Sequence, residues 1–277
     1  MKNRKFSKKV IKYFVSIILF ILSVIPFWIL AVNATRSTEQ IQQGFSMIPS
    51  HFMSFNYEVL TGRGFGFYRG FANSLFISTS FTLVVLYFSA MTAYALVVYE
   101  FKGKKVIFSI IAFVLMVPAQ LSLIGFYKMM LNAGLTDSYI PLILPGLASP
   151  ATVFFMRQYL LSSFPVTLVQ AARIDGASEL SIFHKIGLPL MKPGLATMGI
   201  FTFVGSWNNL IVPLMLISTE DKYTLPMLVQ LLKADIYRTE YGSIYLGVAM
   251  TILPLVLVYA AFSKFIIAGV ALGGVKE

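Results

Sequence analysis

Few side chains of this sequence could take part in chemistry within apolar surroundings. The clearest group is Ser206, Trp207, Asn208 and Asn209, which stand together before Pro213 in the segment FVGSWNNLIVPL. A buried amide must find a hydrogen-bond partner, so these side chains either join one helix to another or donate hydrogen bonds to a polar solute. Both interpretations stay open, and Trp207, Asn208 and Asn209 are the candidates for contact with a solute.

Other reactive groups are scarce, which excludes several classes of function. The sequence has no cysteine, so it offers no disulfide, no thiolate metal site and no cysteine nucleophile. Its two histidines, His51 and His184, are far apart in sequence, and no histidine metal site is expected. The phosphate-binding pattern G-x-x-x-x-G-K-[ST] is absent as well. We therefore expect no catalytic residue, no metal and no cofactor in this chain, and any use of ATP must depend on another subunit.

The elements that hold the candidate residues are apolar segments of membrane-spanning length. Of the 277 residues, 57% are hydrophobic and only 12% are charged, which is about half the charged fraction of a soluble domain. A transmembrane helix needs ~20 apolar residues, and the sequence predicts an all-α, polytopic membrane protein with six transmembrane helices. The six segments are 11–33, 71–99, 105–130, 138–160, 194–217 and 241–268. Kinks are expected at the prolines in or beside them, which are Pro26, Pro118, Pro141, Pro145, Pro213 and Pro254.

The basic residues predict the orientation, because Lys and Arg gather in cytoplasmic loops. With the N-terminus inside, the basic segments 1–12, 100–105 and 157–192 and the C-terminus are cytoplasmic and carry the whole net charge of +11. The first apolar run, of about 19 residues, is longer than the ~7–15 residues of a cleaved signal. We therefore expect a retained anchor and two cytoplasmic termini. Since the charge lies in short loops beside apolar segments, membrane lipid is the expected surrounding and no nucleic acid is expected.

No Asp, Glu, Lys, Arg or His lies well inside any of the six segments. Proton- and ion-coupled transporters usually keep such groups at membrane depth, so a secondary transporter is disfavoured. An intramembrane enzyme is disfavoured too, because it would need a nucleophile with its base or a set of metal ligands. A subunit that assembles other subunits without a pathway of its own stays open.

The loop between the fourth and fifth segments has the pattern of a helical elbow. Thr167 and Gln170 are three residues apart and form a capping-box pattern that predicts the start of a helix. This helix runs to Asp175, and Gly176 permits a break. Small residues at the bend would let another protein surface come close, and they are Ala171, Ala172, Gly176 and Ala177.

A second helical stretch follows the bend. Leu180, Phe183 and Ile186 recur at helical spacing, and we expect this helix to end before Pro189 because the residue before a proline disfavours helix.

The same loop resembles a known motif. The string Q-A-A-x-x-D-G-A, with nine residues between Gly176 and Ile186-x-Leu188-Pro189, is similar to the EAA loop in membrane subunits of binding-protein-dependent ABC importers. Gln170 stands where the family usually has Glu, which keeps the capping geometry but removes a charge. By this resemblance the residues that couple to an ATPase are Gln170, Ala171, Ala172, Asp175, Gly176, Ala177, Ile186, Leu188 and Pro189.

The resemblance covers roughly residues 70–277 and includes the segments 206–217, 224–232 and 268–277, which look like the smaller, six-span maltose and multiple-sugar permeases. It implies a type I ABC importer permease fold. Residues 1–70 would hold the basic tail, the first transmembrane helix and an external loop. Residues 71–277 would form the transmembrane domain, with the cytoplasmic coupling loop at 161–193.

The same resemblance implies the function and the partners. The chain would be half of a heterodimeric pathway for a carbohydrate, with an oligosaccharide favoured, in the plasma membrane of a prokaryote. Its partners would be a second permease, an external solute-binding protein and two ATPase subunits, which bind ATP and Mg and hydrolyse the nucleotide. Lys276 and Glu277 at the C-terminus would also contact the ATPase. A permease for a non-sugar solute and a non-conducting scaffold subunit are the alternatives.

Overall fold

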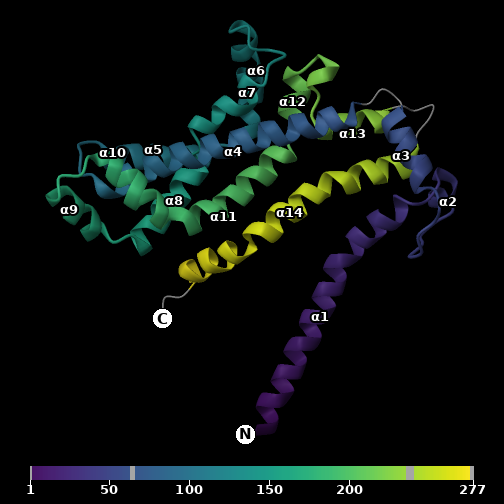
Figure 1. Ribbon diagram of the computed structural model, residues 1–277, viewed down its shortest axis with the longest axis horizontal. Helices are drawn as coiled ribbons and strands as arrows, with labels where there is room; N and C mark the ends of the chain where they lie inside the picture. Colours follow the sequence, from purple (N-terminus) through teal and green to yellow (C-terminus); the bar gives the residue numbers. More distant parts are fainter. Residues whose placement is uncertain (1, 63–65, 235–239, 275–277) are drawn as a thin grey trace. The chain divides into compact units, whose positions relative to one another are not determined.

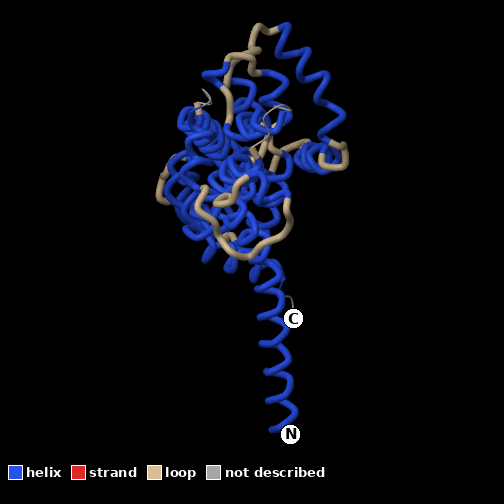
Figure 2. Tube along the Cα trace, turned by 90° about the vertical axis from the view of Figure 1, so that its right-hand side faces the viewer, coloured by secondary structure: helices blue, strands red, loops and turns tan. Residues whose placement is uncertain are grey.

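The computed structural model describes residues 2–62, 66–234 and 240–274, and every regular element in these ranges is helical (Figure 2). The chain forms two compact units. One consists of residues 1–67 and 228–254, and the other consists of residues 68–227 and 255–277. Two helices contribute to both units, α13 (Leu225–Ala234) and α14 (Tyr241–Gly274). The predicted division between residues 70 and 71 stays a prediction.

The first unit begins with α1 (Lys2–Asn33), whose apolar part, Ile11–Asn33, coincides with the first predicted segment. Two shorter helices follow, α2 (Thr38–Gln42) and α3 (Met53–Gly62). A capping box starts α2: the Ser37 hydroxyl accepts the backbone N–H of Gln40 at 3.2 Å, and the Gln40 side chain accepts the backbone N–H of Ser37 at 3.2 Å. Two of the unpaired N–H groups at the helix start are satisfied in this way.

A buried network of hydrogen bonds joins α3 to the start of α14 in this unit. The Asn56 side-chain amide donates to the carbonyl oxygens of Ala34 and Arg36, at 2.9 and 3.0 Å. Gly242 lies so close that a Cβ atom there would stand 2.3 Å from the Arg36 carbonyl oxygen and 2.5 Å from Asn56. The Thr38 hydroxyl completes the network by donating to the Glu240 carboxylate at 2.8 Å. Only glycine fits at position 242, because any side chain would displace backbone.

The second unit is a bundle around the long helix α4, and Figure 1 labels its α-helices. Its elements are α4 (Phe67–Val98), α5 (Lys104–Val114), a 3₁₀ turn (Ala119–Ser122), α6 (Leu123–Asn132), α7 (Ile140–Ile143), a 3₁₀ turn (Leu144–Leu147), α8 (Pro150–Ser163), α9 (Val166–Ile174), α10 (Glu179–Ile182), a π-helical turn (Phe183–Gly187), α11 (Leu188–Trp207), α12 (Ile211–Leu216) and a 3₁₀ turn (Glu220–Lys222).

Among the described residues, five helical stretches are long and apolar enough to cross a membrane, and one bent pair brings the total to the predicted six. The five stretches are Ile11–Asn33, Phe67–Val98, Ile140–Ser163, Glu179–Trp207 and Tyr241–Ala261. The third predicted segment, 105–130, is wrong as one continuous helix. It consists of Lys104–Val114 and Ala119–Asn132, which meet at 91°. Pro118 lies at the bend, where it removes a backbone N–H and bars its predecessor from helical geometry.

The fifth predicted segment, 194–217, also differs from the structure. Helical chain runs from Glu179 to Trp207, past Pro189, and ends at Asn208. Pro189 is tolerated because it directly follows the π-helical turn Phe183–Gly187, where the hydrogen-bond pattern of the helix changes. The second elbow helix therefore does not end before Pro189 as predicted.

The core of the second unit lies where α4, α8 and α11 meet the loop elements between them. Tyr94, Met156, Phe183 and Met191 are buried there together with six other apolar residues, which are Ala90, Ala93, Val98, Leu160, Val169 and Ile182. Close helix contact depends on glycine: a Cβ atom at position 194 would lie 3.0 Å from the Tyr159 ring. Since lipid gives helices little hydrophobic drive to associate, such close van der Waals packing holds a membrane bundle together.

Candidate functional site

The first helix of the elbow, α9 (Val166–Ile174), begins two residues earlier than its sequence pattern indicates. Pro165 is the N-cap of α9, and no side chain caps this end of the helix. The predicted capping box of Thr167 and Gln170 is therefore wrong, because Thr167 already lies inside the first turn. Both side chains are exposed. Gln170 is thus free to face a partner surface.

The predicted break at Gly176 is confirmed. Gly176 has a φ of +79°, in the left-handed region that glycine adopts without strain. The N–H of Gly176 donates to the carbonyl of Arg173 at 3.1 Å, and the N–H of Ala177 donates to the carbonyl of Ala172 at 3.0 Å. These two bonds form a Schellman motif, which satisfies carbonyl groups at the end of α9 and turns the chain sharply.

The elbow has a buried side and an exposed side. Val169, Ile182 and Phe183 enter the core of the second unit. The residues predicted to couple to an ATPase divide between the two sides: Gln170, Ala171, Asp175, Gly176, Ala177 and Pro189 are exposed, whereas Ala172, Ile186 and Leu188 pack partly buried against the core. The structure thus brings all nine onto one elbow, with six of them at its surface.

Two exposed apolar side chains on the elbow were missed by the sequence analysis. Ile174 is 86% exposed beside the bend, and Leu180 is also exposed on α10. Leu180 shares helical spacing with Phe183 and Ile186, yet Phe183 is buried in the core whereas Leu180 is 62% exposed. Apolar side chains at the tip of a loop are typical of a protein interface.

A polar cluster fastens the elbow to the end of α4. The Tyr99 hydroxyl donates to Glu179 Oε2 at 2.6 Å, and the Arg173 guanidinium donates to both carboxylate oxygens of Glu179, at 2.6 and 3.1 Å. The same guanidinium lies over the Tyr99 ring, 5.4 Å from its centre. Partial burial, followed by the bond to Glu179, raises the pKa of Tyr99 to about 12. The phenol therefore stays protonated and remains a donor at any physiological pH.

A second polar cluster lies at the other end of α4. Asp137 accepts hydrogen bonds from the backbone N–H groups of Ser218 and Thr219, at 3.0 and 2.9 Å, and from the Lys222 ammonium at 2.8 Å. These bonds hold the pKa of the Asp137 carboxyl far below its ordinary value. The same loop is joined to α4 by Arg69, which pairs with Asp221. Asp137 and Lys222 thereby fix two loops together.

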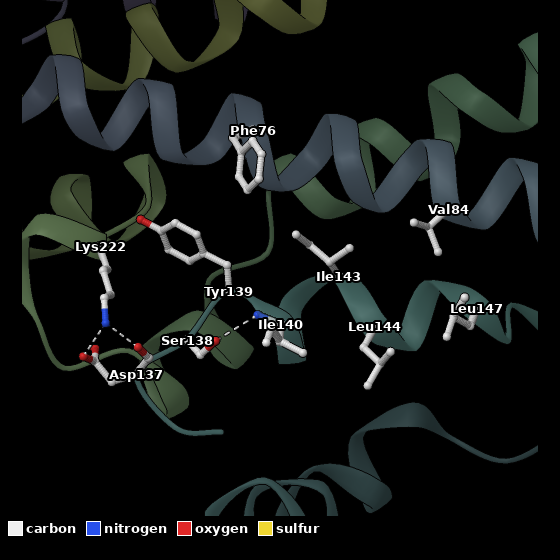
Figure 3. A pocket seen from close by; sticks show the side chains of 10 residues that line it. All are labelled: Phe76, Val84, Asp137, Ser138, Tyr139, Ile140, Ile143, Leu144, Leu147 and Lys222. Atoms are coloured by element: carbon white, nitrogen blue, oxygen red, sulfur yellow. Dashed lines mark hydrogen bonds and ion pairs between the residues drawn. The ribbon is translucent and has the colours of Figure 1, made fainter. Parts of the chain in front are cut away.

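Asp137 and Lys222 line a mainly apolar cavity of about 500 Å³, and Figure 3 shows them at one end of the row of lining side chains. Tyr139 and Phe76 form part of its wall, with ring centres 6.2 Å apart. The Ser138 hydroxyl accepts the backbone N–H of Ile140, the first residue of α7, at 3.2 Å. The cavity contains few other polar groups.

The two clusters are separated by the length of α4. At ~1.5 Å per residue, Arg69 and Tyr99 stand about 45 Å apart along the helix axis, which exceeds the ~30 Å of a bilayer hydrocarbon core. Figure 1 shows α9 and α10 at one end of α4 and α12 toward the other. The elbow and the Asp137 loop therefore belong to opposite faces of the membrane.

The three candidates for contact with a solute have different environments. Trp207 is 1% exposed, stacks on Phe203 with ring centres 5.6 Å apart, and meets the edge of Phe71. Asn209 accepts the backbone N–H of Val212 at 3.4 Å and so caps α12. Asn208, at the end of α11, is exposed. Trp207 thus serves helix packing and Asn209 is half-buried, whereas Asn208 is the exposed side chain of the three.

Two predicted contacts, Lys276 and Glu277, lie outside the described residues. Within the described ranges, no group of three or more His, Asp or Glu side chains converges as a metal site requires.

The chain matches known proteins over most of its length. Residues 86–271 match the family described as binding-protein-dependent transport system inner membrane component. The chain is 38% identical to the arabinooligosaccharides transport system permease protein AraQ of Halalkalibacterium halodurans, over 92% of each chain. It is 30% identical to the lactose transport system permease protein LacG of Rhizobium radiobacter, over 96% of each.

A solved structure shares the fold. A chain of a bacterial ABC transporter involved in the import of the acidic polysaccharide alginate superposes with a TM-score of 0.80, covering 93% of this chain and 97% of that one at 24% identity. The chain therefore belongs to the family of inner membrane components of binding-protein-dependent transport systems and is an ABC importer permease.

Proposed function

We propose that this chain forms one half of the translocation pathway of an ATP-driven carbohydrate importer, and that its elbow receives the motion of an ATPase subunit. The partners are a second permease, two ATPase subunits that bind ATP and Mg, and an external solute-binding protein. The family match supports this set of partners, because its description names binding-protein-dependent transport.

The observation that carries the proposal is the two-sided elbow. Its back, with Val169 and Phe183, is part of the core, so a force on the elbow reaches α4, α8 and α11 directly. Its tip is small and apolar, with Ala171 and Ile174 exposed around the bend at Gly176. Such a surface can fit into a groove of another protein and move with it as a rigid body.

The proposed orientation places this elbow and both termini in the cytoplasm, where ATP is available. The positive charge of the second unit supports it, because the basic segments 100–105 and 157–192 lie at its elbow end. The Asp137 loop then lies outside, where a solute-binding protein would dock.

The proposed solute is an oligosaccharide, since the relatives are named for sugars of two or more units. Asn208 is the residue proposed to face it, because its amide is exposed and can both donate and accept hydrogen bonds with hydroxyl groups.

The test is ATPase activity of the complex purified from its native cells, with and without its binding protein and a panel of arabinooligosaccharides, lactose and an amino acid. We expect stimulation by one sugar class. Ile174→Ser should reduce both the retained ATPase subunit and the stimulation, because it removes an apolar contact at the tip. Gly176→Pro should abolish stimulation, because proline fixes φ near −65° and cannot reach +79°.

The matched control is Ile48→Ser, which makes the same change at a side chain that is 75% exposed in a loop of the other unit. It should leave retention of the ATPase subunit unchanged. If Ile174→Ser retains as much ATPase subunit as the control, the elbow is not the coupling surface. If Asn208→Ala changes assembly but never solute preference, the chain is a scaffold and its partner supplies the sugar contacts.

A further inference from the structure

A cavity of about 650 Å³ lies on the elbow side of the second unit, outside the coupling surface. The loop from α4 to α5 forms one wall, the first turn of α5 forms another, and Arg157 reaches in from α8. Its charged lining residues are Glu100, Lys104, Lys105 and Arg157. Glu100 follows directly after Tyr99, which binds the elbow, so this cavity and the elbow share one face of the membrane.

The cavity carries an excess of positive charge. Lys104 is neutralised by Glu100, with 2.8 Å between ammonium and carboxylate. Across the described ranges, no hydrogen bond or ion pair engages Lys105 or Arg157, and the Arg157 Nε atom is buried without a partner. The positive charges of Lys105 and Arg157 therefore have no anionic partner in the cavity, which favours a ligand that brings negatively charged acceptor oxygens.

The guanidinium is held in place by aromatic rings. The Arg157 Cζ atom lies 3.8 Å from the centre of the Phe108 ring, and Phe108 stacks on Phe154 with an angle of 12° between the rings. A guanidinium held flat in this way presents a planar fork, which matches two oxygens of a phosphate group. Gly103, the N-cap of α5, has no side chain to cap the helix, so the positive end of the helix dipole adds to the attraction.

An apolar surface continues from the charged rim. Val106, Ile110 and Phe113 are exposed on α5 at spacings of four and three residues, so they share one face of the helix. A ligand that places phosphate at the rim can therefore lay a hydrocarbon chain along α5. Basic pockets between transmembrane helices on the cytoplasmic side are typical sites for acidic lipid head groups.

We propose that this cavity binds an anionic phospholipid, with the phosphate between Lys105 and Arg157 and an acyl chain along the exposed face of α5. A bound lipid at this position would brace the α4–α5 loop next to the Tyr99 cluster. The inference rests on this cavity alone and is independent of the transported solute.

The experiment uses the full chain purified in mild detergent. Native mass spectrometry and thermal stability are measured with phosphatidylglycerol and with phosphatidylcholine, for the unaltered chain and for Lys105→Gln and Arg157→Gln. Each removed charge should weaken retention of phosphatidylglycerol about fivefold, with no change for phosphatidylcholine. The control is Lys102→Gln, which removes an exposed charge on the same loop that does not line the cavity.

The outcomes distinguish a lipid site from general charge attraction and from a site for a free anion. A loss of phosphatidylglycerol binding that is confined to the two cavity variants supports the lipid site. If Arg157→Gln does not fold, Lys105→Gln alone decides the question, because Lys105 is exposed and its replacement should not disturb folding. Equal loss in Lys102→Gln would mean general surface attraction and would overturn the proposal. If millimolar inorganic phosphate displaces phosphatidylglycerol and stabilises the chain equally, the ligand is a free anion and the lipid assignment is wrong.

Discussion

Replacement of Gly176 by alanine should loosen the elbow without disturbing its packing. The φ of +79° lies in the left-handed region, where a residue with a Cβ costs ~1–2 kcal/mol. A Cβ atom at this position meets nothing within 4 Å, so no steric term is added. Alanine also lowers the conformational entropy of the opened segment, which disfavours opening by a few tenths of a kcal/mol. This effect is smaller than the strain in the closed state, which favours opening. The expected net destabilisation of the elbow is about 1 kcal/mol.

Hydrogen exchange of the peptides that cover residues 166–177 measures this effect directly. The Gly176 and Ala177 amides are protected by their bonds to Arg173 and Ala172. If opening is local and closing is fast, a loss of about 1 kcal/mol makes these amides exchange about five times faster. Gly176→Asn should exchange more slowly than Gly176→Ala, because asparagine tolerates the left-handed region.

The control is Gly125→Ala in α6, where the added Cβ again meets nothing within 4 Å but the backbone is helical. In this control, hydrogen exchange of the α6 amides should stay unchanged or become slower, because glycine is a weaker helix former than alanine. The reasoning is refuted if Gly176→Ala exchanges like the unaltered chain, or if Gly176→Asn opens the elbow more than Gly176→Ala does.

Three further predictions concern other parts of the chain. Trp207→Ala should lower the free energy of unfolding by about 3–5 kcal/mol, because Trp207 is buried between Phe203 and Phe71. Asn208→Ala should change it by less than ~0.5 kcal/mol. Thermal melting in detergent compares the two variants, and a larger loss for Asn208→Ala would contradict the burial of Trp207. The depressed pKa of Asp137 means that its carboxylate contributes stability above the ordinary value of 3.8 and loses it only as pH falls toward the lower folded value. The difference in melting temperature between the unaltered chain and Asp137→Asn should therefore stay constant from about pH 8 to about pH 5 and narrow below about pH 4. A difference that stays constant down to about pH 3 would mean that the folded and unfolded pKa values of this carboxyl are equal. Gly242→Ala should destabilise the first unit by about 1–3 kcal/mol or more, because the Cβ atom would stand 2.3 Å from the Arg36 carbonyl oxygen; a melting temperature equal to that of Gly125→Ala would be inconsistent with this close approach.

Hydrophobic length predicts most of the membrane architecture. The segments 11–33 and 71–99 nearly coincide with the apolar helices Ile11–Asn33 and Phe67–Val98, because a run of twenty apolar residues has few alternatives to a helix in lipid. The turn at Gly176 was also predictable, since a glycine after a helical stretch commonly takes the left-handed region.

Local patterns failed where a neighbour decides the outcome. Ser37 with Gln40 and Thr167 with Gln170 have the same capping-box spacing, yet only the first forms, because Pro165 starts α9 before Thr167 can cap it. Pro118 breaks a helix whereas Pro189 does not, since Pro189 directly follows a π-helical turn.

The contact of Tyr99 with Glu179 joins residues that are 80 positions apart, and nothing in the sequence near either one indicates it. Two residues that meet only through the packing of α4 against the elbow have no local signal, so this part of the candidate site required the structure.

The 32 residues of α4 have a mechanical consequence for transport. The elbow is joined to one end of this helix by Tyr99, and the loop that contains Asp221 and Lys222 is joined to the other end by Arg69. The helix can therefore act as a beam that is held at both ends. If the beam pivots near its middle, a tilt of about 10° moves each end by about 4 Å in opposite directions, given its length of ~45 Å. An opening on one side of the membrane would then be a closing on the other.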